Sequence, residues 1–116
     1  MRLQSHIFVS GFLRAQQAKG GFGAIARKGS PEAGAVFIVH NRLDGRFCLY
    51  GPAPLSFFDD AQDFSRMFEI VLQDAQESEI ANYLEKQMGF DPDCWVIEIE
   101  RRCERLEVPL IEHGTS

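Results

Sequence analysis

Apolar residues recur with a helical period in two parts of the chain. The first part follows Ser5 and repeats small or apolar residues every three to four positions, which predicts a helix with one buried stripe. This stripe consists of Leu3, Ile7, Phe8, Gly11, Phe12, Ala15 and Ala18. Ser5 is suited to cap the start of the helix, and Gly20-Gly21 is suited to end it. A second helix is predicted over residues 77–88, and Gly89 is expected to close it.

Shorter segments alternate or run apolar in the way that β-strands do. The predicted strands are residues 23–28, 35–42, 46–50, 67–72 and 94–100. Leu43-Asp44-Gly45 predicts a hairpin turn between the second and third strands, and Gly51-Pro52-Ala53-Pro54 is expected to end the third. The expected inward-facing residues are Phe68, Ile70 and Leu72 in the fourth strand and Trp95, Ile97 and Ile99 in the fifth. Glu98 and Glu100 are expected to face outward.

The order of these elements, α-β-β-β-β-α-β, predicts an α+β fold. We expect a mostly antiparallel sheet of about five strands with two helices packed on one face. A chain of 116 residues has room for one hydrophobic core, so residues 1–107 are expected to form a single domain. Residues 108–116 contain Pro109 and little pattern, so they are expected to be a flexible tail.

The central strand is apolar on both of its sides. Val36 and Ile38 alternate with Phe37 and Val39, whereas two helices on one side of an antiparallel sheet leave the other side open. Either the connector with Phe57-Phe58 covers the second side, or another copy of the chain does. The second alternative predicts a homodimer through an apolar sheet face.

Composition and charge narrow the classes of function. The chain is 45% hydrophobic and 25% charged, which is typical of a globular protein. Its net charge of −5 does not favour binding to nucleic acid or to an anionic membrane, and no stretch approaches the roughly 18 apolar residues that span a bilayer. The three cysteines lack metal-ligand spacing, so a cytoplasmic protein with reduced thiols and no cofactor is expected.

Several motifs together resemble an uncharacterised family of small bacterial proteins, a domain of unknown function. They extend over most of the chain, from Met1 to about Arg101. The motifs are Gly21-Phe22, Gly29-x-Pro31-Glu32-Ala33-Gly34-Ala35, Asn41-Arg42-Leu43-Asp44-Gly45, Tyr50-Gly51-Pro52-Ala53-Pro54 and Phe90-Asp91-Pro92-Asp93-x-Trp95-Val96-x-Glu98-Ile99-Glu100. The resemblance implies the family and no activity.

Basic residues near two predicted strand ends form the first candidate site. The candidate residues are Arg27, Lys28, His40, Arg42, Arg46 and Tyr50. As a local positive patch on an acidic chain, they could bind a small anionic ligand or an acidic protein. The alternative is that these charges protect the edge of a sheet from pairing with other chains.

Acidic residues form the second candidate site. Asp91 and Asp93, with Glu98 and Glu100, could hold a hard cation or serve a small hydrolase. The alternative is a turn followed by a solvated strand face. Cys48 or Cys94 would need a histidine base, and His6, His40 and His113 offer no local signature of one, so no catalytic residue is assigned. The leading hypothesis is therefore a non-enzymatic, self-associating binding module, and the alternative is a small hydrolase or cation-dependent enzyme.

Overall fold

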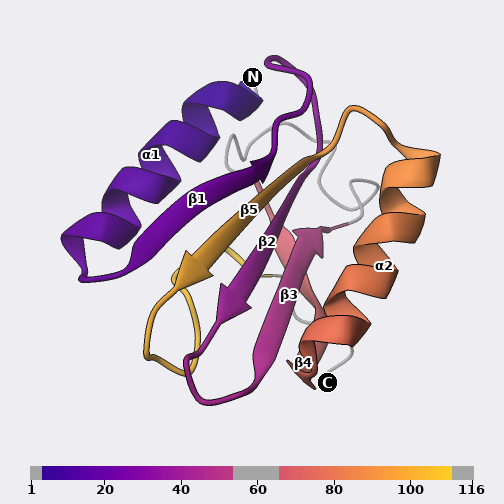
Figure 1. Ribbon diagram of the computed structural model, residues 1–116. Helices are drawn as coiled ribbons and strands as arrows, with labels where there is room; N and C mark the ends of the chain where they lie inside the picture. The colour runs from indigo at the N-terminus through magenta and orange to yellow at the C-terminus, as the bar shows by residue number, and fades with distance from the viewer. Residues whose placement is uncertain (1–3, 54–65, 111–116) are drawn as a thin grey trace, which may run out of the picture.

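The computed structural model describes residues 4–53 and 66–110 and contains two helices and five strands (Figure 1). The elements are α1 (Ser5–Ala18), β1 (Phe22–Arg27), β2 (Val36–Asn41), β3 (Phe47–Pro52), β4 (Phe68–Ala75), α2 (Glu77–Phe90) and β5 (Trp95–Glu100). The predicted element order and the α+β class are confirmed. The connector with Phe57-Phe58 lies outside the described residues. No helix of the described ranges is both long and apolar enough to cross a bilayer.

The strands form one sheet in the order β1-β5-β2-β3-β4. The pairs β1–β5, β2–β3 and β3–β4 are antiparallel, whereas β5 lies parallel to β2. Helix α2 makes the crossover from β4 at one edge of the sheet to β5, which is inserted between β1 and β2. The sheet is thus mixed and mostly antiparallel.

The two helices lie on opposite faces of the sheet, so the prediction that both pack on one face was wrong. Val9 and Phe12 of α1 pack with Ile38 and other residues of one sheet face. Ile80 and Leu84 of α2 pack in a separate cluster on the other face. The reason is that β5 pairs in parallel with β2. Parallel strands need a crossover connection, and α2 makes it on the face opposite α1, so β2 is covered on both sides. Both sides of β2 are therefore buried by the chain's own helices.

The buried side of α1 also differs from the predicted stripe. Phe12 is buried as expected, but Ile7, Gly11, Ala15 and Ala18 are exposed. The buried residues are Ser5, Val9, Phe12 and Gln16. Ser5 is not the N-cap, since Gln4 holds that position, and the buried Ser5 hydroxyl instead donates to the Gly34 carbonyl over 2.5 Å.

The end of β3, the side on which Leu72 lies and the end of α2 differ from the predictions. Strand β3 continues to Pro52 because β4 pairs with it there. A register shift in the β3–β4 pairing places Leu72 on the α2 side while Phe68 and Ile70 stay on the α1 side, so the predicted common side was wrong for Leu72. Helix α2 runs through Gly89.

Residues 101–110 return along the α1 face of the sheet. Leu106 is buried in the α1-side cluster, and Val108 and Leu110 pack against it. The Phe68 amide donates to the Pro109 carbonyl over 2.8 Å at the β4 edge. The α1 face is therefore covered by α1 over β1 and β5 and by this segment near β3 and β4.

Candidate functional site

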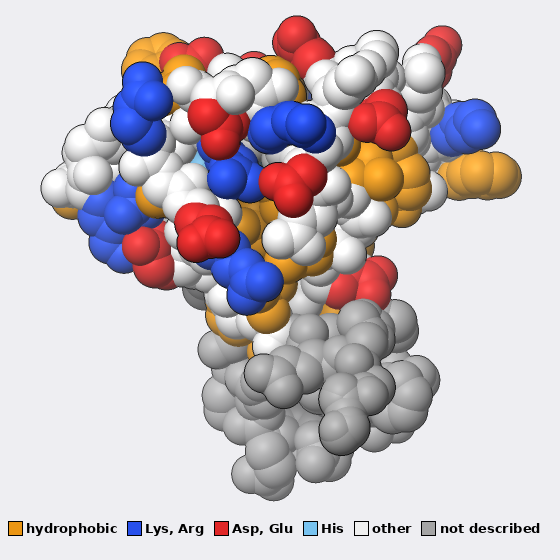
Figure 2. Space-filling model, turned by 90° about the horizontal axis from the view of Figure 1, so that it is seen from below, with side chains coloured by type: hydrophobic (Ala, Val, Ile, Leu, Met, Phe, Trp, Pro, Cys, Tyr) orange, Lys and Arg blue, Asp and Glu red, His pale blue; other side chains and the backbone are white. Residues whose placement is uncertain are grey.

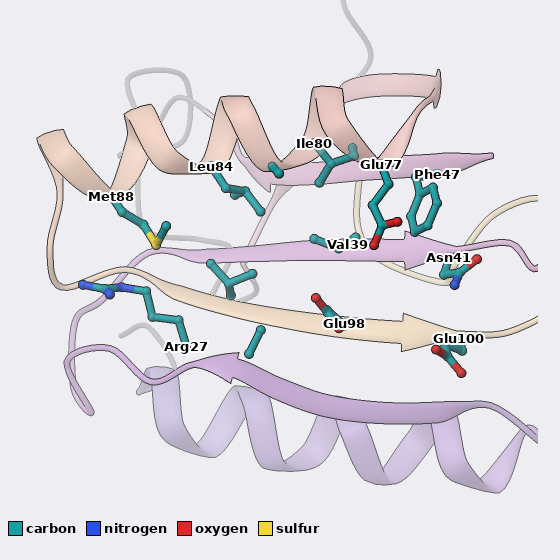
Figure 3. A pocket seen from close by; sticks show the side chains of 13 residues that line it. Arg27, Val39, Asn41, Phe47, Glu77, Ile80, Leu84, Met88, Glu98 and Glu100 are labelled. Atoms are coloured by element: carbon teal, nitrogen blue, oxygen red, sulfur yellow. The ribbon is translucent and has the colours of Figure 1, made fainter. Parts of the chain in front are cut away.

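A groove opens between α2 and the half of the sheet that α2 does not cover (Figure 3). We call it the α2–β5 groove, and it encloses about 340 Å³. Its lining residues are Ala26, Arg27, Val39, Asn41, Phe47, Glu77, Ile80, Ala81, Leu84, Met88, Val96, Glu98 and Glu100. They come from α2 and from four strands, so the groove is a product of the tertiary fold.

The alternation of β5 determines which of its side chains reach the groove. Ile97 and Ile99 point into the α1-side core, so Val96, Glu98 and Glu100 face α2. Val96 is buried in the floor, while both glutamates are exposed above it. The prediction that Glu98 and Glu100 face outward is confirmed.

Strand β1 extends the floor beyond β5. Phe22 lies opposite Glu100, and Ala24 lies opposite Glu98. Residues directly opposite in an antiparallel pair share a face, so Phe22 and Ala24 project to the same side as the two glutamates. Phe22 is 63% exposed, which makes it an open aromatic surface beside the groove.

Helix α2 supplies the apolar wall. Ile80 and Leu84 are buried and Met88 is half-buried, as expected for one face of an amphipathic helix. A reciprocal hydrogen-bonding pair fixes the start of the helix, in which the Gln76 amide donates to the Glu79 carboxylate over 2.8 Å. Glu77, in the same first turn, is thereby held at one end of the groove.

The two ends of the groove differ in charge. Figure 3 shows Glu77 directed from α2 toward the sheet, with Glu98 and Glu100 on β5 below it and Arg27 at the opposite end. The Arg27 guanidinium donates to the Pro92 carbonyl over 2.7 Å, which anchors this cation to the turn before β5. Three carboxylates therefore border an apolar floor at one end of the groove.

The predicted basic residues do not form one patch. Arg27 is the last residue of β1 and Lys28 follows it, whereas Arg42 and Arg46 border the turn of the β2–β3 hairpin. Because β1 runs antiparallel to β5, and β5 parallel to β2, these two pairs lie at opposite ends of the sheet. Strand β5 spans six residues, which separates the ends by about 20 Å.

His40 and Tyr50, the other members of that set, are fully buried. Burial lowers the pKa of His40, whose Nε2 hydrogen-bonds the Arg101 carbonyl at 2.9 Å. Burial raises the pKa of Tyr50 to about 12, and its hydroxyl accepts a hydrogen bond from the Leu106 amide over 3.1 Å. Both side chains serve the core and are closed to a surface ligand.

The two hairpin arginines have partners within the fold. Arg42 pairs with Asp74 at 2.7 Å and with Asp44 at 3.3 Å, and Arg46 donates to the Asp74 carbonyl over 2.9 Å. Asp74 has a φ of +53° and lies at a register shift near the end of β4, between Leu72 and Ala75. Figure 2 shows this end of the molecule, where basic and acidic side chains alternate over the surface. The two ion pairs of Arg42 and the hydrogen bond of Arg46 therefore hold the β2–β3 hairpin and connect it to the end of β4.

The predicted acidic residues fall into two places. Asp91 and Asp93 form the turn before β5, where an Asp91 carboxylate oxygen accepts the Asp93 amide over 3.1 Å. Glu98 and Glu100 lie further along β5, in the groove. Within residues 4–53 and 66–110, no three His, Cys, Asp or Glu side chains are grouped closely enough to hold a metal ion.

The contact between Cys103 and His40 was not predicted from the sequence. The Cys103 sulfur lies 3.8 Å from His40 Nε2, although the two residues are 63 positions apart. Since the Arg101 carbonyl can only accept, His40 Nε2 carries a proton and cannot take one from the thiol. Burial also raises the pKa values of the Cys48 and Cys94 thiols. These contacts provide no activated nucleophile.

Comparisons with known proteins identify the relatives of this chain. The profile of a family described as "Protein of unknown function (DUF1491)" matches residues 3–107. A protein of A. tumefaciens, solved in solution, is 42% identical over 100% of both chains, with a TM-score of 0.83. A DUF1491 family protein from Caulobacter crescentus CB15, solved by crystallography, is 30% identical over 97% of this chain and 100% of that chain, with a TM-score of 0.78. No curated protein matches.

Proposed function

The chain belongs to the DUF1491 family, whose function is unknown, and we propose that it is a non-enzymatic binding module whose site is the α2–β5 groove. One observation carries this proposal: three glutamates border one end of a groove of about 340 Å³ whose floor and α2 wall are apolar. A ligand that carries both apolar surface and positive charge fits this combination.

Charge and apolar surface have separate roles in this proposal. Glu77, Glu98 and Glu100 are exposed and attract cations from solution. Val39 and Val96 beneath them are buried and offer contact to an alkyl or aromatic group. A purely anionic ligand is disfavoured because it would meet these carboxylates.

NMR titration of the isotope-labelled protein with three matched probes tests the site. The probes are hexylammonium, hexanol and hexanoate, which share an alkyl chain and differ in charge. We expect hexylammonium to shift the amide signals of β5 and of the groove side of α2, hexanol to do so more weakly, and hexanoate to leave them unchanged. Equal shifts from all three, or shifts elsewhere in the fold, would contradict the proposal.

Charge-matched variants separate the groove from general electrostatics. Glu98→Gln and Glu100→Gln are expected to weaken hexylammonium binding by about two- to five-fold each, the value of an exposed ion pair. Glu85→Gln and Glu104→Gln change the net charge equally at exposed positions that do not line the groove. They are expected to leave binding unchanged.

Self-association is the alternative use of the surface. It was expected from an uncovered apolar face of β2, but α1 and α2 cover both sides of that strand. Exposed Ile7 on α1 and Ile25 on β1 support this alternative. Sedimentation of the protein at increasing concentration tests this alternative, and a dimer that blocks hexylammonium would place a second copy in the groove.

A further inference from the structure

From the same groove, and resting on the function proposed for it, we infer the class of its natural occupant. The occupant is an amphipathic, cationic α-helix of a partner protein, which lies beside α2 over β5 and β1. It would complete the helical layer on this face of the sheet. The inference rests on the space that the groove offers, on backbone hydrogen bonding and on charge.

The open half of the sheet has the width of one helix. Helix α2 packs on β3 and β4. Neighbouring strands are about 4.8 Å apart, so β5, two strands from β3, lies about 10 Å from it. Packed helices are separated by about 8–10 Å. A second helix beside α2 would therefore lie over β5, with β1 under its outer side.

The length also fits a helix of ordinary size. Helix α2 has 14 residues, which correspond to about 21 Å. Strand β5 has six residues, or about 20 Å. An occupant of about 14 residues would run along the whole groove, from Arg27 to the end with the three glutamates.

A helix satisfies its own backbone, whereas an extended peptide on this face would not. The groove lies above the sheet, where the strand amides and carbonyls of β5 are already paired with β1 and β2. An extended occupant would therefore leave backbone donors and acceptors unpaired over an apolar floor, at a cost of about 1–3 kcal/mol each when buried. Side chains alone contact a sheet face, which is how α1 and α2 bind it.

The exposed surface defines the chemistry of the occupant. Phe22 is the large aromatic side chain beside Ala24 on β1, and it is the anchor for an apolar stripe. Glu98 and Glu100 lie on β5, between Phe22 on β1 and Glu77 on α2, so negative charge borders that stripe on its α2 side. A helix with an apolar stripe bordered by Lys or Arg is complementary to both features.

The test uses three synthetic peptides of 15 residues and the full-length protein. The first peptide has a Leu/Ala stripe flanked by lysines and is locked as a helix by a hydrocarbon staple. The second has the same composition with central D-residues that prevent a helix, and the third replaces each Lys by Glu. Fluorescence anisotropy measures binding, and amide shifts locate it.

We expect the locked cationic helix to bind at least ten-fold more tightly than the other two, and to bind less tightly as salt is added. Phe22→Ala should weaken this binding about ten-fold. Leu43→Ala, which truncates another exposed apolar side chain at the hairpin, should not. Neither side chain belongs to the core, since Phe22 is 63% and Leu43 is 42% exposed, so both variants are expected to fold.

The outcomes separate this inference from the proposed function. If hexylammonium binds in the groove but the locked helix binds no better than the non-helical peptide, the helical occupant is refuted and the binding site stands. If neither the amine nor any peptide shifts the groove signals, both are refuted. Equal effects of Phe22→Ala and Leu43→Ala would also refute the helical occupant.

Discussion

The turn between β1 and β2 provides a sharp test of the packing, because two glycines of the chain should respond to the same substitution in opposite ways. A Cβ atom at Gly29 would lie 2.1 Å from the Asp93 carbonyl oxygen and 2.7 Å from the Cys94 carbonyl carbon. A Cβ atom at Gly11, on the exposed side of α1, would meet nothing within 4 Å. We compare Gly29→Ala with Gly11→Ala.

The size of the destabilisation by Gly29→Ala depends on how far the backbone around the new methyl group would have to move. A carbon and a carbonyl oxygen in contact are about 3.3 Å apart, so Gly29→Ala requires the turn and the start of β5 to separate by about 1 Å. The Ser30 amide donates to the Asp93 carbonyl over 2.9 Å, and Trp95 Nε1 donates to the Ser30 carbonyl over 2.7 Å across this contact. Overpacking costs about 1–3 kcal/mol, and each weakened buried hydrogen bond adds to it.

We therefore expect Gly29→Ala to lower the free energy of unfolding by about 2–5 kcal/mol. Gly11→Ala should raise it by about 0.5–1 kcal/mol, because alanine is the better helix former. Urea unfolding followed by tryptophan fluorescence measures both, since Trp95 is the single tryptophan and is buried beside the turn. A loss below about 0.5 kcal/mol for Gly29→Ala would refute the close approach described here.

Three further predictions concern buried or paired groups. Because burial lowers the pKa of His40, the stability that its neutral form contributes is present above the unfolded value of 6.5 and is lost as the pH falls toward the lower folded value. The urea midpoint should fall more between pH 7 and pH 5 for the wild type than for His40→Gln, and parallel curves would contradict this. Tyr50→Phe should lower the free energy of unfolding by about 1–2 kcal/mol, because it leaves the Leu106 amide without its acceptor. An unchanged urea midpoint would contradict that role of the Tyr50 hydroxyl. Hydrogen bonding from Arg101 lowers the pKa of Glu107 to about 2. The stability that the ionised Glu107 carboxylate contributes is therefore present above about pH 4.3 and is lost as the pH falls through about 2. NMR titration of the Glu107 carboxyl checks the value, and an ordinary midpoint would show that the contact at 2.8 Å does not persist in solution.

Local patterns were sufficient to predict the elements, because hydrophobic period and turn residues act over a few positions. All seven elements were expected in the observed order, and Ile97 and Ile99 face the core as predicted. The buried face of α1 could not be predicted in the same way. Ser5 and Gln16 are polar, and each is buried through a partner distant in sequence: Gly34 for Ser5 and Arg101 for Gln16.

The predictions of the helix positions and of the basic site were wrong for a related reason. The parallel pairing of β5 with β2 joins segments more than fifty residues apart, and no pattern within either segment predicts this pairing. Without it, the second apolar side of β2 required cover from the connector with Phe57-Phe58 or from another copy of the chain, and Arg27 was grouped with Arg42. With it, α2 covers β2, and those two arginines lie at opposite ends of the sheet.

The same pairing explains why Glu98 could be predicted to face outward and yet not be recognised as part of a groove. An alternating strand has the same sequence whether its polar side faces bulk water or borders a cavity. The difference lies in its neighbours: buried Val96 beneath the glutamates and Phe22, 63% exposed, beside them. Burying an exposed phenylalanine contributes about 1.5–3 kcal/mol, and a partner that covers this side of β1 would obtain that gain. A polar face that serves only solubility offers no such gain. Phe22→Ala therefore distinguishes a solvated face from a binding site, because only a binding site predicts weaker binding of the helical peptide.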